Sequence, residues 1–525
     1  MTFSCLSLEQ PGRWRGGATG VIFLIAALPL FPLLWLAIPS PGRETGDFAL
    51  WDGLRNALWL ASGASAIGLI VGLPLGVLSA LYEFRGRTML LALVALPLLM
   101  PSLLWAIGWS SAIPRLGGAP PSRFAFAGGV HVFALATIPL VLFTAAAATR
   151  GVSGSQLDAA RLAGGETTAL VSACRHAALP SILAAVLAGI LTLADPGPGQ
   201  ILGIPTAAAQ ILTSFAAHYD AARAGRQCVL LTLAVLSMSA PLAWLVAHRF
   251  APVILVKQPY GVRRSGHRGM RTIAALALVT VLALGLIMPL SGLLAPLLDV
   301  GSEAGRDAFL GKHPVLVLPA MGGAAFNTVL YALGAGIIGT SLGVLLAACV
   351  GRDVRLRRLS LGMAVALVCW PPATAAIGIA YLVTQAPAWA DVLSRGRVMV
   401  CVALGLRLFP VAAVIALRAW GMGPPSWTLV AALHGVPFST YVRRVWGPYL
   451  APSLALALLL IGLLASADVS TVLLLHPPGE PSMTLAIFTV MANAPEWTVA
   501  SMCLAYLSLT AVALSVGLAL AARLR

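Results

Sequence analysis

Residues 55–82 read RNALWLASGASAIGLIVGLPLGVLSALY, and residues 326–352 read FNTVLYALGAGIIGTSLGVLLAACVGR. Each stretch is mostly apolar, and its one charged residue is an arginine at an end. Each is also longer than the roughly 20 residues that a helix needs to cross the hydrocarbon core of a membrane. The two stretches resemble one another, with Asn56 opposite Asn327. They therefore predict two related membrane-spanning helices, and the rest of the chain extends this pattern.

The composition excludes a soluble globular protein. Of the 525 residues, 59% are hydrophobic and 10% are charged, which is too little charge to cover a water-exposed surface. Long apolar runs recur along the whole chain and predict an all-α membrane protein of about 12 transmembrane helices. These runs lie near 17–38, 55–82, 88–113, 124–149, 178–195, 227–248, 272–297, 325–350, 359–384, 397–418, 452–475 and 497–522. The first run follows Arg13 and Arg15 and is long enough to span, so we interpret it as an uncleaved helix rather than a signal peptide.

The second half of the chain repeats the first at an offset of 270 to 273 residues. Further matched positions pair Gly108 with Gly378, Pro139 with Pro410, and Asp195 with Asp468. Six predicted spans lie on each side of a basic stretch, so both halves start on the same side of the membrane and form parallel repeats. The predicted organisation is a first transmembrane repeat at 1–255, a basic cytoplasmic linker at 256–271 and a second transmembrane repeat at 272–525.

Basic residues orient these spans. The net charge is +16, and 31 of the 33 basic residues are arginines, most of them in short loops. With the amino terminus inside, 22 basic residues fall on the cytoplasmic side and 10 on the other, which predicts that both termini are cytoplasmic. This placement reflects membrane topology and argues against a nucleic-acid partner. The seven cysteines are scattered singly and the histidines lack metal-ligand spacing, so we expect no disulfide framework, metal site or cofactor.

Two short segments outside the spans share a pattern. The first has Asp158-Ala159-Ala160 followed by Gly164, and the second has Leu429-Val430-Ala431 followed by Gly435. In a helix the alanines of the first segment form a small-residue face, and each glycine could end its helix in a left-handed cap. One such segment could be an ordinary loop, but two in register favour a surface that docks another protein. The candidate docking residues are Asp158, Ala159, Ala160, Gly164, Ala431, Gly435 and Pro448.

The two segments resemble the EAA loop (E-A-A-x3-G-x9-I-x-L-P) of permease subunits of binding-protein-dependent ABC importers. Asp158 stands in place of Glu in the first copy, and Leu429-Val430 in place of Glu-Ala in the second. The resemblance implies the type I ABC importer transmembrane fold, with each loop forming a coupling helix on a separate cytoplasmic ATPase, expected as a homodimer. It also implies a periplasmic substrate-binding protein as partner and a multi-pass location in the bacterial inner membrane. The fused two-repeat form looks most like the ferric-iron and thiamine permeases.

Other function classes fit less well. The chain has no G-x4-G-K-[ST] motif, so ATP hydrolysis is expected in a partner subunit and the chain itself is not expected to be an enzyme. A secondary transporter with two six-span repeats is the alternative, but it would not need the two matched segments. An intramembrane enzyme would need a motif such as HExxH, which the sequence lacks, or GxSxG. The stretch Gly339-Thr340-Ser341-Leu342-Gly343 matches GxSxG, but it lies inside a long apolar predicted helix and not at the strand-to-helix turn that this motif requires. Through the resemblance ferric iron leads as substrate, with thiamine, a polyamine or a phosphonate left open.

Three charged residues lie within or at the ends of spans. Placing a charge such as Arg407 in the middle of a membrane-spanning helix costs at least about 2.5 kcal/mol of insertion free energy, unless the charge forms an ion pair or contacts water. Arg407 therefore either bonds a neighbouring element or lines a path. Asp195 and Asp468 each follow a re-entry proline by about sixteen residues, which places them in the outer part of the membrane. Each could cap a helix or line the path. The candidate translocation path therefore contains Asp195, Asp468 and Arg407.

Overall fold

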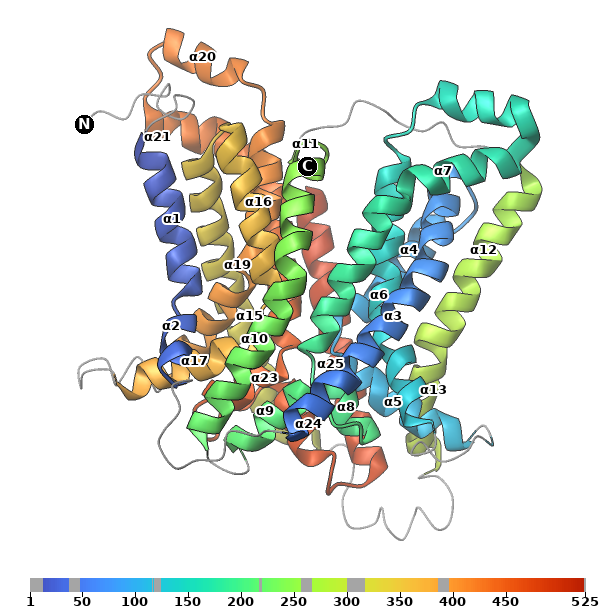
Figure 1. The fold of residues 1–525 in the computed structure, drawn as a ribbon, viewed down its shortest axis with the longest axis vertical. Helices are drawn as coiled ribbons and strands as arrows, with labels where there is room; N and C mark the ends of the chain where they lie inside the picture. The colour runs from blue at the N-terminus through green and yellow to red at the C-terminus, as the bar shows by residue number, and fades with distance from the viewer. Residues whose placement is uncertain are drawn as a thin grey trace.

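The computed structural model describes residues 13–36, 48–115, 117, 124–216, 220–255, 267–299, 317–385 and 396–523. These residues form a bundle of helices (Figure 1). In the first half the helices are α1 (Arg13–Ala27), α2 (Leu30–Leu36), α3 (Phe48–Leu81), α4 (Arg87–Leu99), α5 (Ser102–Arg115), α6 (Ala125–Thr149), α7 (Gly154–Leu193), α8 (Gly197–Leu202), α9 (Ala207–Ala216), α10 (Ala221–Leu245), η3 (Val246–Phe250) and α11 (Ala251–Leu255).

The second half contains a comparable series. Its helices are α12 (Arg268–Leu282), η4 (Ala283–Ile287), α13 (Met288–Asp299), α15 (Val317–Val350), α16 (Val354–Val368), α17 (Pro372–Thr384), α19 (Arg397–Met422), α20 (Ser426–Leu433), α21 (Phe438–Tyr441), η7 (Val442–Trp446), α22 (Gly447–Ser466), α23 (Val469–Leu475), α24 (Met483–Val490) and α25 (Glu496–Arg523).

The described helices include nine that are long and apolar enough to cross a membrane, or up to eleven if each of two bent pairs counts as one span. A further apolar helix, Trp14–Ala27, is shorter. The prediction of an all-α membrane protein is therefore confirmed. The expected number of about twelve transmembrane helices stays a prediction, since the described residues support nine to eleven.

The two bent pairs lie in the expected spans near 88–113 and 359–384. Helices α4 and α5 meet at 101°, and α16 and α17 meet at 89°. Met100 is extended (φ −113°, ψ 154°) before Pro101, and Pro371 is extended (φ −62°, ψ 133°) before Pro372. A residue that precedes proline is disfavoured in the helical region by the proline ring, so each proline breaks its run. Each of these two expected spans is therefore a pair of helices joined at a sharp bend.

A third interruption lies within the expected span 452–475. Helix α22 ends at Ser466, and α23 begins at Val469 with Asp468 as its N-cap residue. The corresponding region of the first half has the same form, because α7 ends at Leu193 and α8 begins at Gly197. Both aspartates therefore lie in breaks between helices.

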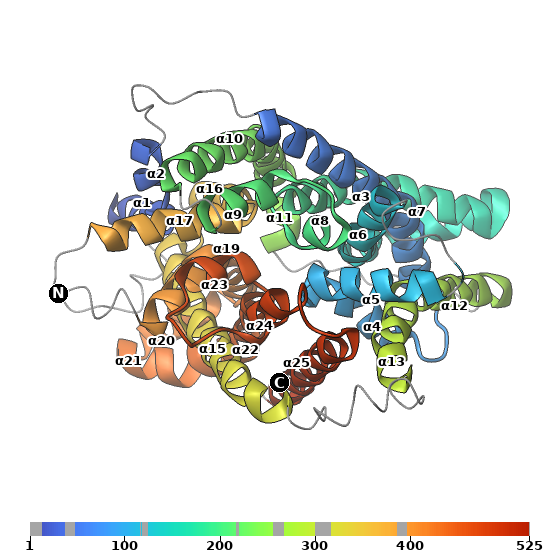
Figure 2. The same ribbon diagram turned by 90° about the horizontal axis from the view of Figure 1, so that it is seen from below.

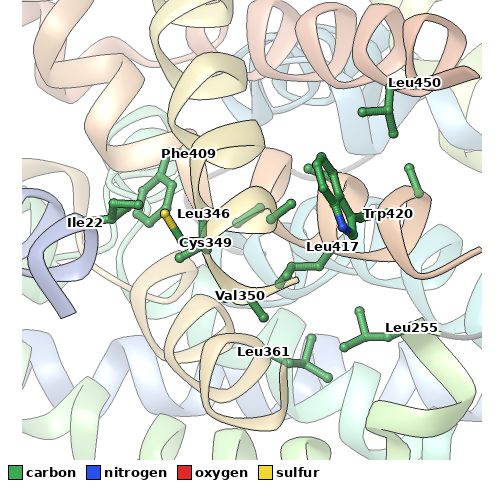
Figure 3. Close-up of a cluster of buried hydrophobic side chains, with 14 of the residues drawn as sticks. Ile22, Leu255, Leu346, Cys349, Val350, Leu361, Phe409, Leu417, Trp420 and Leu450 are labelled. Carbon is green, nitrogen blue, oxygen red and sulfur yellow. The ribbon is translucent and has the colours of Figure 1, made fainter. Parts of the chain in front are cut away.

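The first helices of the two halves exchange places. Helix α1 packs against α15, α16 and α19 of the second half, whereas α12 packs against α3 and α4, and α13 against α5. The same arrangement is visible from below (Figure 2). A buried cluster joins Ile22 of α1 and Leu255 of α11 to Leu346, Phe409 and Trp420 (Figure 3). The two sets of helices are interlocked rather than packed side by side as separate bodies.

Two arginines fasten the end of α11 to the second half. Arg357 Nη2 donates to the carbonyl oxygen of Leu255 at 2.8 Å, and Arg418 Nη1 donates to that of Ile254 at 2.6 Å. The last carbonyls of a helix have no partner within the helix and carry its partial negative charge. The two guanidinium groups satisfy them and fix where the chain leaves the first set of helices.

The bundle has two distinct ends (Figure 1). Helix α20 and the first turns of α7 project from the end where α1 begins and α25 finishes. Helices α8, α9, α23 and α24 lie toward the opposite end. The two segments that the sequence singled out therefore share one end of the molecule.

Candidate functional site: two projecting segments and a central cavity

The first projecting segment is the amino-terminal part of α7. Ser153 caps the helix, and its hydroxyl oxygen accepts a hydrogen bond from the backbone N–H of Gln156 at 3.4 Å. Asp158, Ala159 and Ala163 are exposed, Ala160 is half-buried, and Leu162 is 91% exposed. The expected exposed face of small residues is therefore present, with a leucine beside it.

The helix breaks at a glycine pair. Gly164 is extended (φ −167°), and Gly165 takes the left-handed conformation (φ 75°). The expectation that Gly164 provides the left-handed residue is wrong by one position, because its neighbour Gly165 is equally free of a Cβ and takes that role. Thr168 Oγ1 donates to the carbonyl oxygen of Gly164 at 2.9 Å and supports the kink.

A charged network ties this segment to the end of α3. Arg161 pairs with Asp158 at 2.8 Å and with Glu166 at 3.2 Å. Tyr82, which is fully buried, donates its hydroxyl to Glu166 Oε2 at 2.7 Å. Burial and the contact with Glu166 raise the pKa of Tyr82 above its usual value, so its hydroxyl stays protonated and remains a donor. The sequence reasoning missed Tyr82 and Glu166, because their partnership depends on how α3 and α7 pack.

The second projecting segment, α20, ends in a Schellman motif. Gly435 takes the left-handed conformation (φ 61°), as expected. The N–H of Val436 bonds the carbonyl oxygen of Ala431 at 2.9 Å, and the N–H of Gly435 bonds that of Ala432 at 3.1 Å. This pair of bonds defines the motif and satisfies the last carbonyls of the helix.

The exposed face of α20 differs from that of the first segment. Ala431 is buried, whereas Leu429, Val430 and Leu433 are 51%, 52% and 85% exposed. This face is aliphatic rather than lined with alanine. The segment is held from beneath by Thr428, whose hydroxyl lies 3.0 Å from that of Tyr441. The remaining candidate, Pro448, is exposed in the first turn of α22.

Aromatic rings support this second segment. Trp420 and Trp446 are stacked with ring centroids 4.4 Å apart, and Trp427 meets Tyr449 edge-on at 5.1 Å. Trp427 belongs to α20, and its ring partners Trp446 and Tyr449 belong to η7 and α22, while Trp420 of α19 stacks on Trp446. Such rings bury large apolar areas with defined geometry. These ring contacts connect α20 to η7 and to the first turn of α22, and through Trp446 to the end of α19.

A cavity of about 280 Å³ lies between the two halves of the chain. Both helix breaks contribute to its wall, through Met100 and Pro101 in the first half and Trp370 and Pro372 in the second. The three path candidates, Asp195, Arg407 and Asp468, also line it. The structure thus brings together charged residues that are far apart in the sequence. Within the described part of the chain, no group of three His, Cys, Asp or Glu side chains is placed to hold a metal ion.

Asp195 is held on both carboxylate oxygens. Its Oδ1 accepts from the backbone N–H of Gly197 at 2.9 Å, and its Oδ2 accepts from the Ser102 hydroxyl at 2.5 Å. Ser102 is the first residue of α5, immediately after the break at Pro101. Asp195 therefore caps a backbone N–H and links the α7–α8 junction to the bent helix pair, while also lining the cavity.

Asp468 caps α23 and pairs with Arg407. Its carboxylate accepts from the backbone N–H of Thr471 at 2.9 Å and from the Thr471 hydroxyl at 2.7 Å, and it forms an ion pair with Arg407 Nη1. The side chain of Asp468 is 2% exposed and that of Arg407 is 19% exposed. Both aspartates therefore bond backbone N–H groups, as one interpretation of the sequence proposed, and both also line the cavity.

Comparison with known proteins yields two relatives. No family model matches the chain, and no solved structure matches it. The chain is 30% identical to the probable molybdenum ABC transporter permease protein of Haloferax volcanii over 189 residues, which make up 34% of this chain and 69% of that protein. It is 29% identical to the molybdate/tungstate transport system permease protein of Pyrococcus abyssi over 99 residues, which make up 16% of this chain and 40% of that protein. Each relative is therefore about half as long as this chain, or shorter.

Proposed function

The chain belongs to the ABC transporter permease family, and from this premise we propose that it forms the membrane path of an importer for a tetrahedral oxyanion such as molybdate or tungstate. The observation that carries the proposal is the central cavity, to which both halves contribute a helix break and charged residues. Broken helices inside a membrane are tolerated where they face protein or line a cavity. A cavity bounded by two such breaks is suited to a small polar substrate.

The two projecting segments are proposed as the contacts with a separate ATPase. They share one end of the bundle, and each ends at a glycine with positive φ. Each also continues into a long helix that reaches the cavity wall, α7 toward Asp195 and α22 toward Asp468. Movement of a segment would therefore be transmitted to the residues at the far end of its helix.

We further propose that the chain is a fusion of two permease repeats of the type I importer fold, at 1–255 and 272–525, joined by the linker at 256–271. The half-length relatives support this organisation, as do the matched lengths of α3 and α15, 34 residues each. One chain would then present both coupling segments to a homodimeric ATPase. A periplasmic binding protein would deliver substrate at the opposite end, with both termini cytoplasmic in the bacterial inner membrane.

The substrate proposal departs from the resemblance seen in the sequence. Both relatives are named for molybdenum or for molybdate and tungstate, which favours an oxyanion over ferric iron or thiamine. The cavity agrees, since a hard trivalent cation would seek several free oxygen ligands, whereas the two carboxylates in the wall are already engaged by hydrogen bonds or by Arg407.

Reconstitution tests this function. The chain is inserted into proteoliposomes with its ATPase and binding protein, and uptake of molybdate, tungstate, sulfate and ferric iron is measured with ATP and without it. We expect ATP-dependent uptake of molybdate or tungstate. ATP-dependent uptake of ferric iron and of no oxyanion would refute the substrate and leave the permease role intact. Uptake that needs no ATPase would contradict the role itself.

A further inference from the structure

Two leucines on the projecting segments are unusually exposed. Among the described residues, Leu162 and Leu433 are the two most exposed large apolar side chains, at 91% and 85%. The internal repeat matches them, because they lie 271 residues apart and each stands two residues before a matched glycine, Gly164 or Gly435. Exposing a leucine to water is unfavourable. The same exposure at two matched positions therefore indicates that both side chains are covered in the working complex.

Lipid does not provide this cover where the segments project. Both leucines lie at the same end of the bundle (Figure 1). Helix α7 is 40 residues long, about twice the length that a membrane requires, and Leu162 lies in its first turns, before the glycine kink. The next most exposed apolar side chains are Leu298 and Ile70, at 78% and 72%. Those two lie on candidate membrane spans, so lipid can cover them.

The surfaces around the two leucines differ in chemistry. Residues three and four positions apart share one face of a helix. Leu162 therefore shares its face with Asp158 and Ala159, which are both exposed. Leu433 shares its face with the exposed aliphatic residues at 429–430. Leucine is thus the large exposed side chain that both segments have in common, although the residues around it are polar or small in one segment and aliphatic in the other.

A protein pocket fits these leucines better than a membrane surface does. The side chain of Asp158 is 69% exposed and pairs with Arg161 at 2.8 Å, one turn before Leu162. Inserting this leucine into a bilayer would carry the ion pair toward lipid, where charges are costly. Protein interfaces combine an apolar centre with a polar rim that stays in contact with water. Such an interface can bury Leu162 and leave the ion pair at its edge.

We propose that Leu162 and Leu433 anchor the two projecting segments, each inserted into an apolar pocket on one subunit of a homodimeric ATPase. The proposal rests on the ATPase partner proposed above and names the side chains that hold it. Two identical subunits offer two identical pockets, and a matched leucine is what two otherwise different segments can both present to them. Burying a leucine side chain that was fully exposed is a large gain for a single aliphatic residue.

Photo-crosslinking identifies what covers each leucine. The photoreactive residue p-benzoyl-phenylalanine replaces Leu162, Leu433 or Leu298 in the complete permease, which is held in nanodiscs with the purified ATPase of the transporter. We expect crosslinks to the ATPase from the first two positions, and both should map to the same segment of its sequence. Leu298 is the matched control, because it is strongly exposed but lies on α13, toward the opposite end of the bundle (Figure 1). Crosslinks from Leu162 and Leu433 to lipid, to a second permease or to different ATPase segments, or none to the ATPase, would overturn the proposal.

Alanine variants measure the contribution of each leucine. Leu162→Ala and Leu433→Ala keep a good helix former and remove the side chain beyond Cβ. Because three carbon groups leave a buried site, we expect each variant to bind the purified ATPase roughly tenfold or more weakly. The double variant should lose the ATP hydrolysis that the binding protein stimulates, whereas Leu298→Ala should match the wild type. Both leucines are exposed in the permease itself, so thermal unfolding of each variant without the ATPase should be unchanged.

The result separates this inference from the proposed function. Biolayer interferometry measures ATPase binding to the permease in nanodiscs, and proteoliposomes measure ATP-driven molybdate uptake by the same proteins. Wild-type affinity in the Leu162→Ala/Leu433→Ala double variant, with normal uptake by the wild type, would overturn the leucine anchors and leave the transport function standing. A wild-type permease that neither binds the ATPase nor takes up substrate with ATP would instead overturn the proposed function.

Discussion

Arg407 of α19 forms an ion pair with Asp468, the residue that caps α23 at the break after α22. The pair joins two elements of the second half in the wall of the central cavity. The first half keeps the aspartate, as Asp195, but has Ala136 where the arginine would be. Asp195 is satisfied instead by a serine hydroxyl and a backbone N–H. The two halves thus stabilise the same helix break by different chemistry.

This difference predicts unequal responses to charge removal. Arg407→Gln leaves the buried Asp468 carboxylate without its ion pair, and removing one member of a buried pair typically costs about 3–5 kcal/mol. The double variant Arg407→Gln/Asp468→Asn should lose less stability than Arg407→Gln alone. Thermal unfolding of the purified complex measures both. If the double variant loses as much stability as the two single variants lose together, or more, the result contradicts the pairing.

Asp195 should stabilise the fold in two ways, by accepting from the backbone N–H of Gly197 and by bonding Ser102 of α5. Asp195→Ala removes both acceptors and should lower stability by about 1–2 kcal/mol, whereas Asp195→Asn keeps one acceptor oxygen and should lose less. Ser102→Ala removes the hydroxyl that donates to Asp195. In the Asp195→Ala background it should cause little further loss of stability, because the two residues share this one hydrogen bond. Unfolding curves of the four proteins test this. Additive losses would show that Ser102 and Asp195 act independently.

Topology can be checked at turns that the structure describes. Reporters at Gly351, between α15 and α16, and at Gly435, after α20, should both report cytoplasm. A reporter at Asn493, between α24 and α25, should report the opposite side. These sites follow from the positive-inside assignment together with the two ends of the bundle. A cytoplasmic signal at Asn493 would contradict the proposed orientation.

The order of the first projecting segment should depend on Glu166. Glu166→Gln weakens the pair with Arg161, and Tyr82→Phe removes the hydroxyl that bonds Glu166 at 2.7 Å. Each change should loosen the first turns of α7 without disturbing the membrane part of the helix. Hydrogen exchange in residues 154–166 should rise several-fold, with residues 181–193 unchanged as the internal control. If exchange in residues 154–166 is the same in the variants as in the wild type, the network does not order the segment.

The sequence predicted the helical membrane class and the three charged residues of the cavity, because long apolar runs and isolated charges within them are local signals. It did not predict the breaks at Pro101 and Pro372 as bends, although both prolines were visible. A proline in an apolar run is compatible with a kinked or a broken helix, and the surrounding packing decides between them.

The glycines of the two projecting segments show how precisely a left-handed residue can be located from the sequence. Gly435 is the one glycine after α20, so the left-handed residue was identified correctly. The first segment has adjacent glycines, and the sequence does not distinguish which of them takes positive φ. Backbone geometry assigns that role to Gly165.

This assignment yields the last prediction. Gly165→Ala and Gly435→Ala place a Cβ on a left-handed residue, which costs roughly 1–2 kcal/mol, although no neighbouring atom lies within 4 Å of either added Cβ. The strain should change the local path of each segment and lower both transport and the ATP hydrolysis that the binding protein stimulates, with membrane insertion unaffected. Gly154→Ala is the matched control, since its Cβ also meets nothing within 4 Å and its φ is not positive. Full coupling in the Gly165→Ala/Gly435→Ala double variant would show that these segments do not transmit motion from the ATPase.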